Sequence, residues 1–334
     1  MSKEVVLSGI RPTGFLHLGN YFGAMRNYVR MQNDYHCYFF VANWHSLTTH
    51  PDTKALKQAV KRVIAENIAC GLDTEKAVFY VQSDVPEIAE LYLNLNMLAY
   101  KGELEKTTTF KDKVRTQPDN VNAGLLTYPV LQAADILIHR AVKVPVGKDQ
   151  EQNLEMARNF AQRFNHRYGD IFPMPYAFNY GGELVKILSL DGNGKMSKSE
   201  NQMATLYLAD EDDIIRKKIL KAKTDSGPTE TNSVKPDYID NLFTLMKLTS
   251  TEDVVKKYED DFNNSSAGNC IIRYGDMKKQ LAEDMINFIK PIREKAAELQ
   301  KNTDLLDKII KQGADKARAS ASATIELVRK AVLG

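Results

Sequence analysis

The sequence predicts a parallel α/β domain followed by an all-helical domain. The first half alternates short runs of β-branched and aromatic residues with segments of helical pattern. From residue 210 onward the apolar residues follow the period of an α-helix, and almost no strand signal remains. The chain has 334 residues, of which 43% are hydrophobic, and this length is enough for two domains with their own cores.

Four apolar runs in the first half are typical of strands, and a helical pattern follows each of them. We expect strands at residues 3–9, 36–42, 77–81 and 141–146, and helices at 20–31, 52–70, 87–100, 123–140 and 149–164. Because parallel strands are joined by right-handed helical crossovers, this order predicts a sheet with helices on both faces. The carboxyl ends of the strands, with the loops that follow them, would meet at one edge.

The second half is predicted to be helices joined by polar loops. We expect helices at 210–223, 238–248, 250–258, 276–299 and 303–333. The segment 190–201 (LDGNGKMSKSEN) is expected to be a mobile loop, since it carries two glycines and two lysines. These patterns divide the chain into a first domain at 1–209, a helical domain at 210–292 and a C-terminal helix within 293–334 that packs back on the first domain.

Composition narrows the class of protein. Lys and Arg number 45 against 43 Asp and Glu, a net charge of +2, which excludes a strongly basic surface over the whole protein but not a local patch. Cys37, Cys70 and Cys270 lie far apart and form neither a disulfide framework nor a CxxC site, as expected in a reducing cytosol. No apolar run is long enough to span a bilayer, and the first residues read as a strand rather than a leader.

The stretch RPTGFLHLGNYFGA, residues 11–24, places a glycine-rich turn between the first strand and a helix. The spacing from Gly9 to Gly14 is that of a P-loop, but Phe15 and Leu16 stand where Lys and Ser/Thr are required, so that motif fails. His17 and the start of the helix can donate hydrogen bonds to phosphate oxygens, and Gly19 allows a ring or ribose to approach the backbone. The alternative is a simple turn with a histidine on the surface.

A second motif, KMSKS at residues 195–199, follows much later in the chain. Its lysines are three residues apart, so each can meet a different oxygen of a pyrophosphate leaving group. A loop of this kind can close over a nucleotide and reopen for product release. Taken alone, the segment could equally be a solvated surface loop.

Together, HLGN and KMSKS resemble the two signatures of class I aminoacyl-tRNA synthetases, whose first signature is usually HIGH. With SGIRPTG, AADIL and VPVGKDQ in the same order, the chain is similar to the tryptophanyl-tRNA synthetase family from about Val5 to Asn201. The resemblance implies a Rossmann-like catalytic domain that contains the KMSKS loop, a helical domain that binds tRNA and its anticodon, and a cytoplasmic homodimer. It also implies that ATP, arriving with Mg²⁺, activates L-tryptophan for transfer to tRNA(Trp), with no tightly bound metal or iron–sulfur cluster.

The same resemblance implies the ATP-binding residues. His17, Asn20, Lys195 and Lys198 are expected to act in catalysis. The full ATP-binding set is Arg11, Pro12, Thr13, His17, Gly19, Asn20, Lys113, Gly147, Asp149, Gln150, Lys195, Met196, Ser197, Lys198 and Ser199. No residue of this sequence is assigned to a metal.

Tryptophan recognition is expected to depend on Asp135. Indole offers one polar group, an N–H that can only donate, so a buried carboxylate is a suitable hydrogen-bond acceptor for recognising it. Asp135 lies in an apolar stretch where an unpartnered charge is costly, and its position in the family gives it this role. The resemblance implies the remaining residues around the amino acid, namely Leu7, Gly9, His45, Tyr128, Gln132, Val144, Val146 and Gln150. Gln132 stands where many relatives have methionine.

Two further points stay open in the sequence. A cationic helix face could follow a phosphate backbone, or it could be an ordinary solvated face; its residues are Arg216, Lys217, Lys218, Lys221 and Lys223. A tyrosyl-tRNA synthetase shares both signatures, but it needs a second polar side chain to hydrogen-bond the phenol hydroxyl of its substrate. That side chain is typically a tyrosine where this chain has Leu7. A catalytically silent paralogue that binds tryptophan or tRNA is disfavoured by the intact motifs.

Overall fold

The structure is a computed structural model that describes residues 3–147, 150–180, 185–197 and 201–334. It divides into two compact units. Unit 1 consists of Met1–Thr13, Tyr28–Gly182 and Asn302–Gly334, and unit 2 of Gly14–Asn27 and Glu183–Lys301. The described residues include no helix long and apolar enough to cross a membrane.

The described part of unit 1 holds one five-stranded sheet in the order β3-β2-β1-β4-β5, and every pairing is parallel. The strands are β1 (Val5–Ile10), β2 (His36–Val41), β3 (Val78–Val81), β4 (Lys143–Val144) and β5 (Tyr176–Ala177). In β2, every residue after His36 is buried, as expected for a strand covered on both faces. The predicted α/β class with a parallel sheet is confirmed.

The sheet shows where the strand predictions were less accurate. Residues 141–146 give a strand of only two residues, β4, and β5 was not predicted at all. Both residues of β5 are exposed, so the segment has no buried apolar run to mark it in the sequence.

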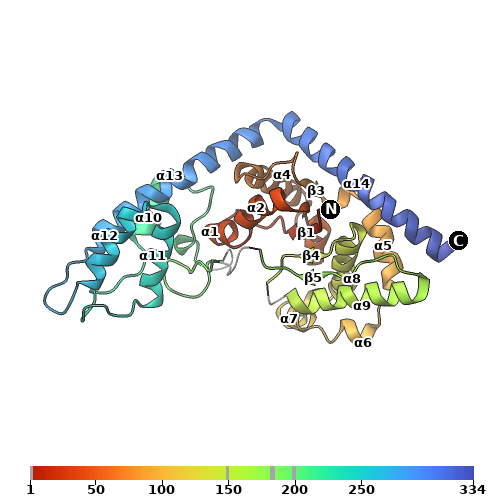
Figure 1. Cartoon of the computed structure of the whole chain (residues 1–334), viewed down its shortest axis with the longest axis horizontal. Coiled ribbons are helices and arrows are strands. Elements are labelled where there is room, and N and C mark those ends of the chain that lie inside the picture. Colours follow the sequence, from red (N-terminus) through yellow and green to blue (C-terminus); the bar gives the residue numbers. More distant parts are fainter. Residues whose placement is uncertain (1–2, 148–149, 181–184, 198–200) are drawn as a thin grey trace. The chain divides into compact units, whose positions relative to one another are not determined.

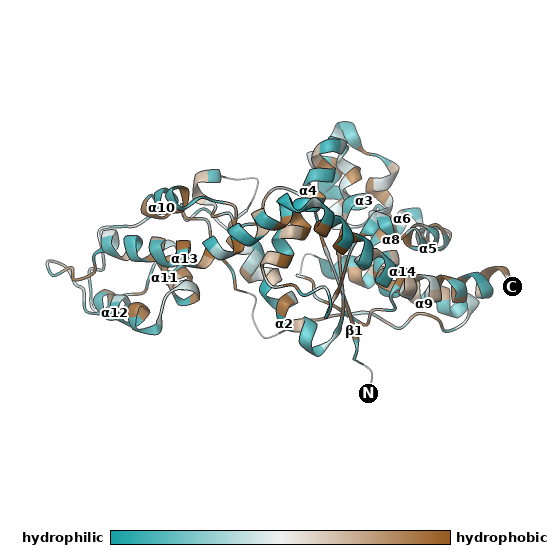
Figure 2. Ribbon diagram, turned by 90° about the horizontal axis from the view of Figure 1, so that it is seen from above, coloured by the Kyte–Doolittle hydropathy of each residue, from teal (hydrophilic) through white to brown (hydrophobic). Residues whose placement is uncertain are grey.

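Helices cover the sheet of unit 1 (Figure 1). Those wholly or mainly in unit 1 are α2 (Arg26–Asp34), α3 (Asn43–Ser46), α4 (Thr53–Ala69), α5 (Glu87–Asn96), α6 (Lys101–Leu104), α7 (Thr108–Thr116), α8 (Ala123–Ile138), α9 (Glu151–Tyr168) and α14 (Thr303–Leu333). Helix α4 begins where the Asp52 carboxylate accepts from the Ala55 N–H, and α8 begins where Asn122 accepts from the Leu125 N–H. Figure 2 shows the alternating hydrophilic and apolar faces of α4 and α14.

The C-terminal helix α14 packs against β3 and α5 of unit 1. Small side chains make this close approach possible, because Gly313, Ala314, Ala317 and Ala321 are all buried. At Gly313 a Cβ atom would lie 1.9 Å from the carbonyl oxygen of Phe79, so no larger residue fits without moving the backbone.

The described part of unit 2 is mainly helical, with short extended segments between the helices. Its helices are α1 (Leu18–Asn20), a π-helical turn at Tyr21–Met25, α10 (Asp212–Leu220), α11 (Asp237–Thr249), α12 (Glu252–Asn263) and α13 (Tyr274–Lys301). The rings of Phe22 and Phe288 stack 5.5 Å apart, so the N-terminal segment packs on α13. Residues 14–27 and 183–209 thus belong to the helical unit, and the two units divide the chain differently from the domain boundaries suggested by the sequence.

Candidate active site

A cavity of about 380 Å³ opens at the carboxyl ends of β1 and β4 in unit 1. This volume is within the range of small-molecule sites. All nine residues expected around the amino acid line it, together with Arg11, Lys113 and Gly147 from the expected ATP set. The remaining lining residues are Ser8, Tyr28, Phe40, Ala42, Thr48, Thr109, Leu125, Ile136 and Pro145.

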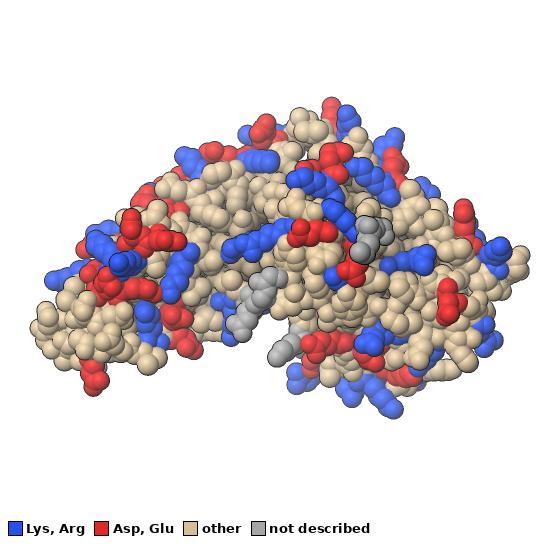
Figure 3. Space-filling model, viewed as in Figure 1, with Lys and Arg blue, Asp and Glu red and all other residues tan. Residues whose placement is uncertain are grey.

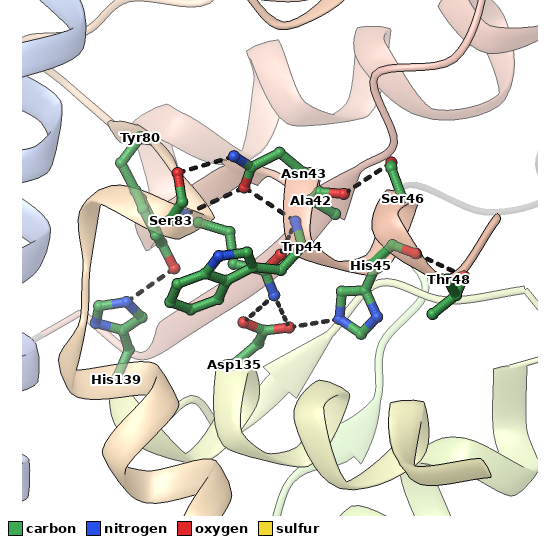
Figure 4. Close-up of polar contacts among 11 residues, drawn as sticks. Ala42, Asn43, Trp44, His45, Ser46, Thr48, Tyr80, Ser83, Asp135 and His139 are labelled. Carbon is green, nitrogen blue, oxygen red and sulfur yellow. Dashed lines mark hydrogen bonds and ion pairs between the residues drawn. The ribbon is translucent and has the colours of Figure 1, made fainter. Parts of the chain in front are cut away.

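Asp135 of α8 is the fully buried carboxylate of this cavity (Figure 4). Its Oδ2 atom lies 2.9 Å from Nε2 of His45. The side-chain amide of Gln82 donates to both oxygens, at 2.8 Å to Oδ1 and 2.9 Å to Oδ2. Burial raises the pKa of Asp135, while the hydrogen bonds and charge of His45 and the hydrogen bond of Gln82 oppose that rise.

Gln82 is a residue of this site that the sequence analysis missed. It is completely buried in the short 3-10 turn Gln82–Asp84, directly after β3. Its Oε1 atom accepts from the backbone N–H of Trp44 at 3.1 Å, which orients the amide so that its nitrogen faces Asp135. Its position in the sequence could have identified it, because a polar residue directly after a buried strand lies at the same sheet edge as the other site residues.

A second buried polar group lies one helical turn beyond Asp135, at the end of α8. His139 Nε2 is 2.9 Å from the Tyr80 hydroxyl, and His139 Nδ1 is 3.2 Å from Ser320 Oγ on α14. The Tyr38 ring stacks on the imidazole with centroids 4.1 Å apart. Burial, helped by the charge of His36, lowers the pKa of His139 to about 3, so the ring is neutral.

Backbone and side-chain packing shape the rest of the cavity. A Cβ at Gly9 would lie 2.6 Å from the Phe40 ring, so only glycine lets that ring pack across β1. The Tyr128 hydroxyl donates to Asn153, whose amide donates to Oε1 of Gln150 at 2.9 Å. Thus α8 and α9 together set the position of the Gln150 side chain.

The first motif lies in unit 2 and forms a hydrogen-bonded turn. His17 is only 5% exposed, which excludes the alternative of a surface histidine. The side-chain oxygen of Asn20 accepts from the His17 N–H at 3.1 Å, closing the turn that begins α1. A Cβ at Gly19 would lie 2.9 Å from the His17 ring, so glycine is required for the ring to pack over the backbone.

The second motif begins in a tight hairpin rather than an irregular loop. The Met196 N–H donates to the Ile187 carbonyl at 3.0 Å, and Gly192 and Gly194 both have positive φ angles in the turn between them. Met196 is buried, whereas Lys195 is exposed. Of the predicted residues, Asp149, Lys198 and Ser199 lie outside the described residues.

The cationic face predicted on the helix at 210–223 is smaller than the sequence suggests. Lys218 is buried and pairs with Asp210 at 2.7 Å, and Arg216 pairs with Glu283 at 2.8 Å. Lys217, Lys221 and Lys223 remain exposed. The charge pattern of the sequence could not distinguish the buried lysine from the exposed ones. Lys218 is buried because it pairs with Asp210, which lies eight residues earlier.

No group of three or more His, Cys, Asp and Glu side chains within the described ranges has a geometry that could hold a metal ion.

A parallel sheet with a carboxylate cavity at its carboxyl edge, in one chain with the HLGN and KMSKS sequences, is typical of a class I aminoacyl-tRNA synthetase. The family model described as tRNA synthetases class I (W and Y) matches residues 2–290, and the chain belongs to this family.

Relatives within the family are similar over nearly the whole chain. The tryptophan–tRNA ligase of Porphyromonas gingivalis is 57% identical over 327 residues, covering 98% of each chain. That of Oceanobacillus iheyensis is 40% identical over 335 residues with the same coverage. The crystal structure of tryptophanyl-tRNA synthetase from Campylobacter jejuni, complexed with ADP and tryptophan, has a TM-score of 0.87 at 36% identity and covers 98% of both chains.

Proposed function

We propose that this chain uses ATP to activate L-tryptophan as tryptophanyl-adenylate and transfers the tryptophanyl group to tRNA(Trp) in translation. The tryptophan–tRNA ligases that it matches over 98% of their length, and the relative crystallised with ADP and tryptophan, support this activity. In the reaction the carboxylate of tryptophan attacks the α-phosphorus of ATP and pyrophosphate leaves. A terminal ribose hydroxyl of the tRNA then attacks the acyl carbon of the adenylate, and AMP leaves.

The observation that carries the substrate assignment is Asp135. It is an acceptor-only group when ionised, and it is fully buried in a cavity that apolar side chains such as Leu7 and Val144 also line. A ligand with one N–H and a flat apolar ring satisfies such a site. A phenol would need a partner that also donates, and Leu7 lines the cavity where such a group would be required.

For ATP, the chemistry calls for positioning and charge neutralisation more than for a protein nucleophile. In unit 2 the proposed ligands are His17, Gly19, Asn20 and the lysines of KMSKS. In unit 1 they are the segment 11–13, Lys113, Gly147 and Gln150, with Asp149 retained from the sequence. Mg²⁺ would arrive with ATP as part of the substrate.

Partners beyond the small molecules are also proposals. The helices of residues 210–292 would bind tRNA and its anticodon, with the exposed Lys217, Lys221 and Lys223 near the phosphates. On the face seen in Figure 3, acidic side chains stand among the basic ones, so any tRNA contact there is local.

A cytoplasmic homodimer is proposed through apolar side chains on α5 and after it, where Leu93, Met97 and Tyr100 are 57%, 74% and 64% exposed.

The test is amino-acid-dependent exchange between ATP and pyrophosphate, run with tryptophan, tyrosine and phenylalanine on the natural chain and on Asp135→Ala. We expect exchange with tryptophan alone and its loss in the variant. Exchange with tyrosine would overturn the specificity but keep the reaction. No exchange with any of the three, by a protein whose circular dichroism shows it folded, would leave only a binding role.

A further inference from the structure

A short segment of unit 2, residues 205–210 (TLYLAD), connects the two motifs, and we call it the strap. On one side it pairs with the chain around His17: the Leu18 N–H donates to the Leu206 carbonyl at 3.0 Å, and the Leu208 N–H donates to the Leu16 carbonyl at 2.8 Å. His17 itself lies opposite Tyr207 in this antiparallel bridge. The backbone that presents HLGN is therefore held by the strap.

The other side of the strap reaches the KMSKS segment. The Thr205 hydroxyl is 3.1 Å from the Ser197 carbonyl, and Thr205 is 1% exposed. The carbonyl of Met196 lies 3.5 Å from the Cβ position of Gly19, so the second motif also passes close to the first. A displacement of the strap would move both motifs.

Lys218 of α10 holds the strap at both of its ends. Its ammonium donates to the Thr205 carbonyl at 2.8 Å and to the two carboxylate oxygens of Asp210 at 2.9 and 2.7 Å. These contacts give the ammonium a backbone carbonyl and a carboxylate as acceptors, and the lysine is only 4% exposed. The ammonium also lies 4.8 Å from the centroid of the Tyr207 ring in the middle of the strap.

The acceptor side of this ion pair is fixed as well. Oδ2 of Asp210 accepts from the backbone N–H of Tyr207 at 2.8 Å, which folds the end of the strap into a turn. Arg293 of α13 donates to the Asp210 carbonyl and, at 2.7 Å, to Asp212 at the start of α10. The strap is thus tied to two long helices of unit 2 by charged hydrogen bonds.

We propose that Lys218 is a positioning residue for adenylate formation, which sets the placement of HLGN and KMSKS through the strap. This inference rests on the proposed function, since it assigns Lys218 to the ATP-dependent step. A buried lysine that only stabilised the fold would have no reason to affect that step more than tryptophan binding. Because Asp135 and its cavity lie in unit 1, the two effects can be measured separately.

The test compares Lys218→Met with Lys247→Met. Lys247 is a matched control, because it also forms an ion pair in unit 2, at 2.8 Å to Glu259, but its side chain is 54% exposed. Exchange between ATP and pyrophosphate reports the chemical step, and equilibrium dialysis with radiolabelled tryptophan reports the cavity. For Lys218→Met we expect kcat of exchange to fall at least about tenfold, since small misplacements of reacting groups are costly. Its dissociation constant for tryptophan, and both quantities for Lys247→Met, should stay within about twofold of the natural chain.

A second variant keeps the proposal testable if Lys218→Met does not fold. Thr205→Val preserves shape but removes the hydroxyl bonded to the carbonyls of Ser197 and Asn201, so it loosens the connection to KMSKS and leaves the Lys218 contact with the Thr205 carbonyl in place. It should lower kcat of exchange in the same direction with tryptophan binding unchanged. Natural exchange rates in both folded variants, or a loss of tryptophan binding equal to the loss of exchange, would overturn the role of Lys218. Absence of exchange in the natural chain would instead overturn the proposed function.

Discussion

Asp135 is the stronger acceptor for an indole N–H when it is ionised, and burial raises its pKa above the ordinary value of 3.8. A carboxyl with a raised pKa is charged above that pKa and neutral below it. Tryptophan affinity should therefore weaken as pH falls through the raised pKa of Asp135, which lies above the ordinary 3.8. Asp135→Asn should lose at least about tenfold in affinity at neutral pH, as expected for a hydrogen bond to a charged group.

Equilibrium dialysis with tryptophan across pH measures both effects. Asp84→Asn is the control, because burial also raises the pKa of Asp84, which lies in the same turn as Gln82 but does not line the cavity. Unchanged affinity in Asp135→Asn would mean that the indole N–H is read elsewhere.

Gln82 should lower the pH at which tryptophan binding is half lost, because it acts on the pKa of Asp135. Its amide bonds favour the ionised form of Asp135 and so oppose the rise in pKa. Gln82→Met keeps a similar volume but has no donor, so the midpoint of tryptophan binding should move to higher pH than in the natural chain. The same dialysis series checks this, and an unmoved midpoint would remove Gln82 from the site.

At the scale of elements, the contact of α14 with β3 depends on one glycine. Gly313→Ala would place a methyl group 1.9 Å from the Phe79 carbonyl, so the helix or the strand must move. We expect a loss of about 3 kcal/mol in the free energy of unfolding, as for other severe overpacking. Urea denaturation measures it, with Gly102→Ala of α6 as control, because a Cβ there meets nothing within 4 Å. Equal stability of the two variants would contradict the packing argument.

The contact between α8 and α14 should also be sensitive to acid. The pKa of His139 falls from 6.5 to about 3 on burial, so the unfolded chain binds a proton between these values and the native chain does not. Stability is therefore complete above about pH 6.5 and declines as pH falls, by up to about 1.4 kcal/mol per pH unit for this group. His139→Gln should show a shallower decline in urea midpoints over that range. A decline as steep as in the natural chain would assign it to other groups.

The sequence was most informative where a local pattern determines the structure. Continuous apolar runs located β1, β2 and β3, and helical periods located α4, α8 and α14. The exposed pair of residues in β5 carries no such pattern, and neither does the burial of Lys218, which depends on Asp210 and the strap. Gln82 was missed for the same reason, because only the fold brings the end of β3 to Asp135. Contacts between distant segments need the structure.

At the scale of the whole molecule, the proposed homodimer needs an apolar surface on each copy. Leu93 of α5 and Met97, directly after α5, are four residues apart and are both exposed. Beside them, Trp44, Leu47, Tyr92 and Leu131 line an apolar groove of about 380 Å³. Exposed apolar area of this kind is stable in water mainly when a partner covers it.

Sedimentation equilibrium should therefore give about twice the chain mass of 37.7 kDa. Met97→Lys should shift the protein to the mass of one chain, because a dimer would have to bury two unpaired charges near each other. Leu333→Lys is the matched control, since Leu333 is 83% exposed at the far end of α14 and its charge should leave the mass unchanged. A natural chain that sediments as a monomer would overturn the dimer, whereas a dimeric Met97→Lys variant would place the contact on another surface.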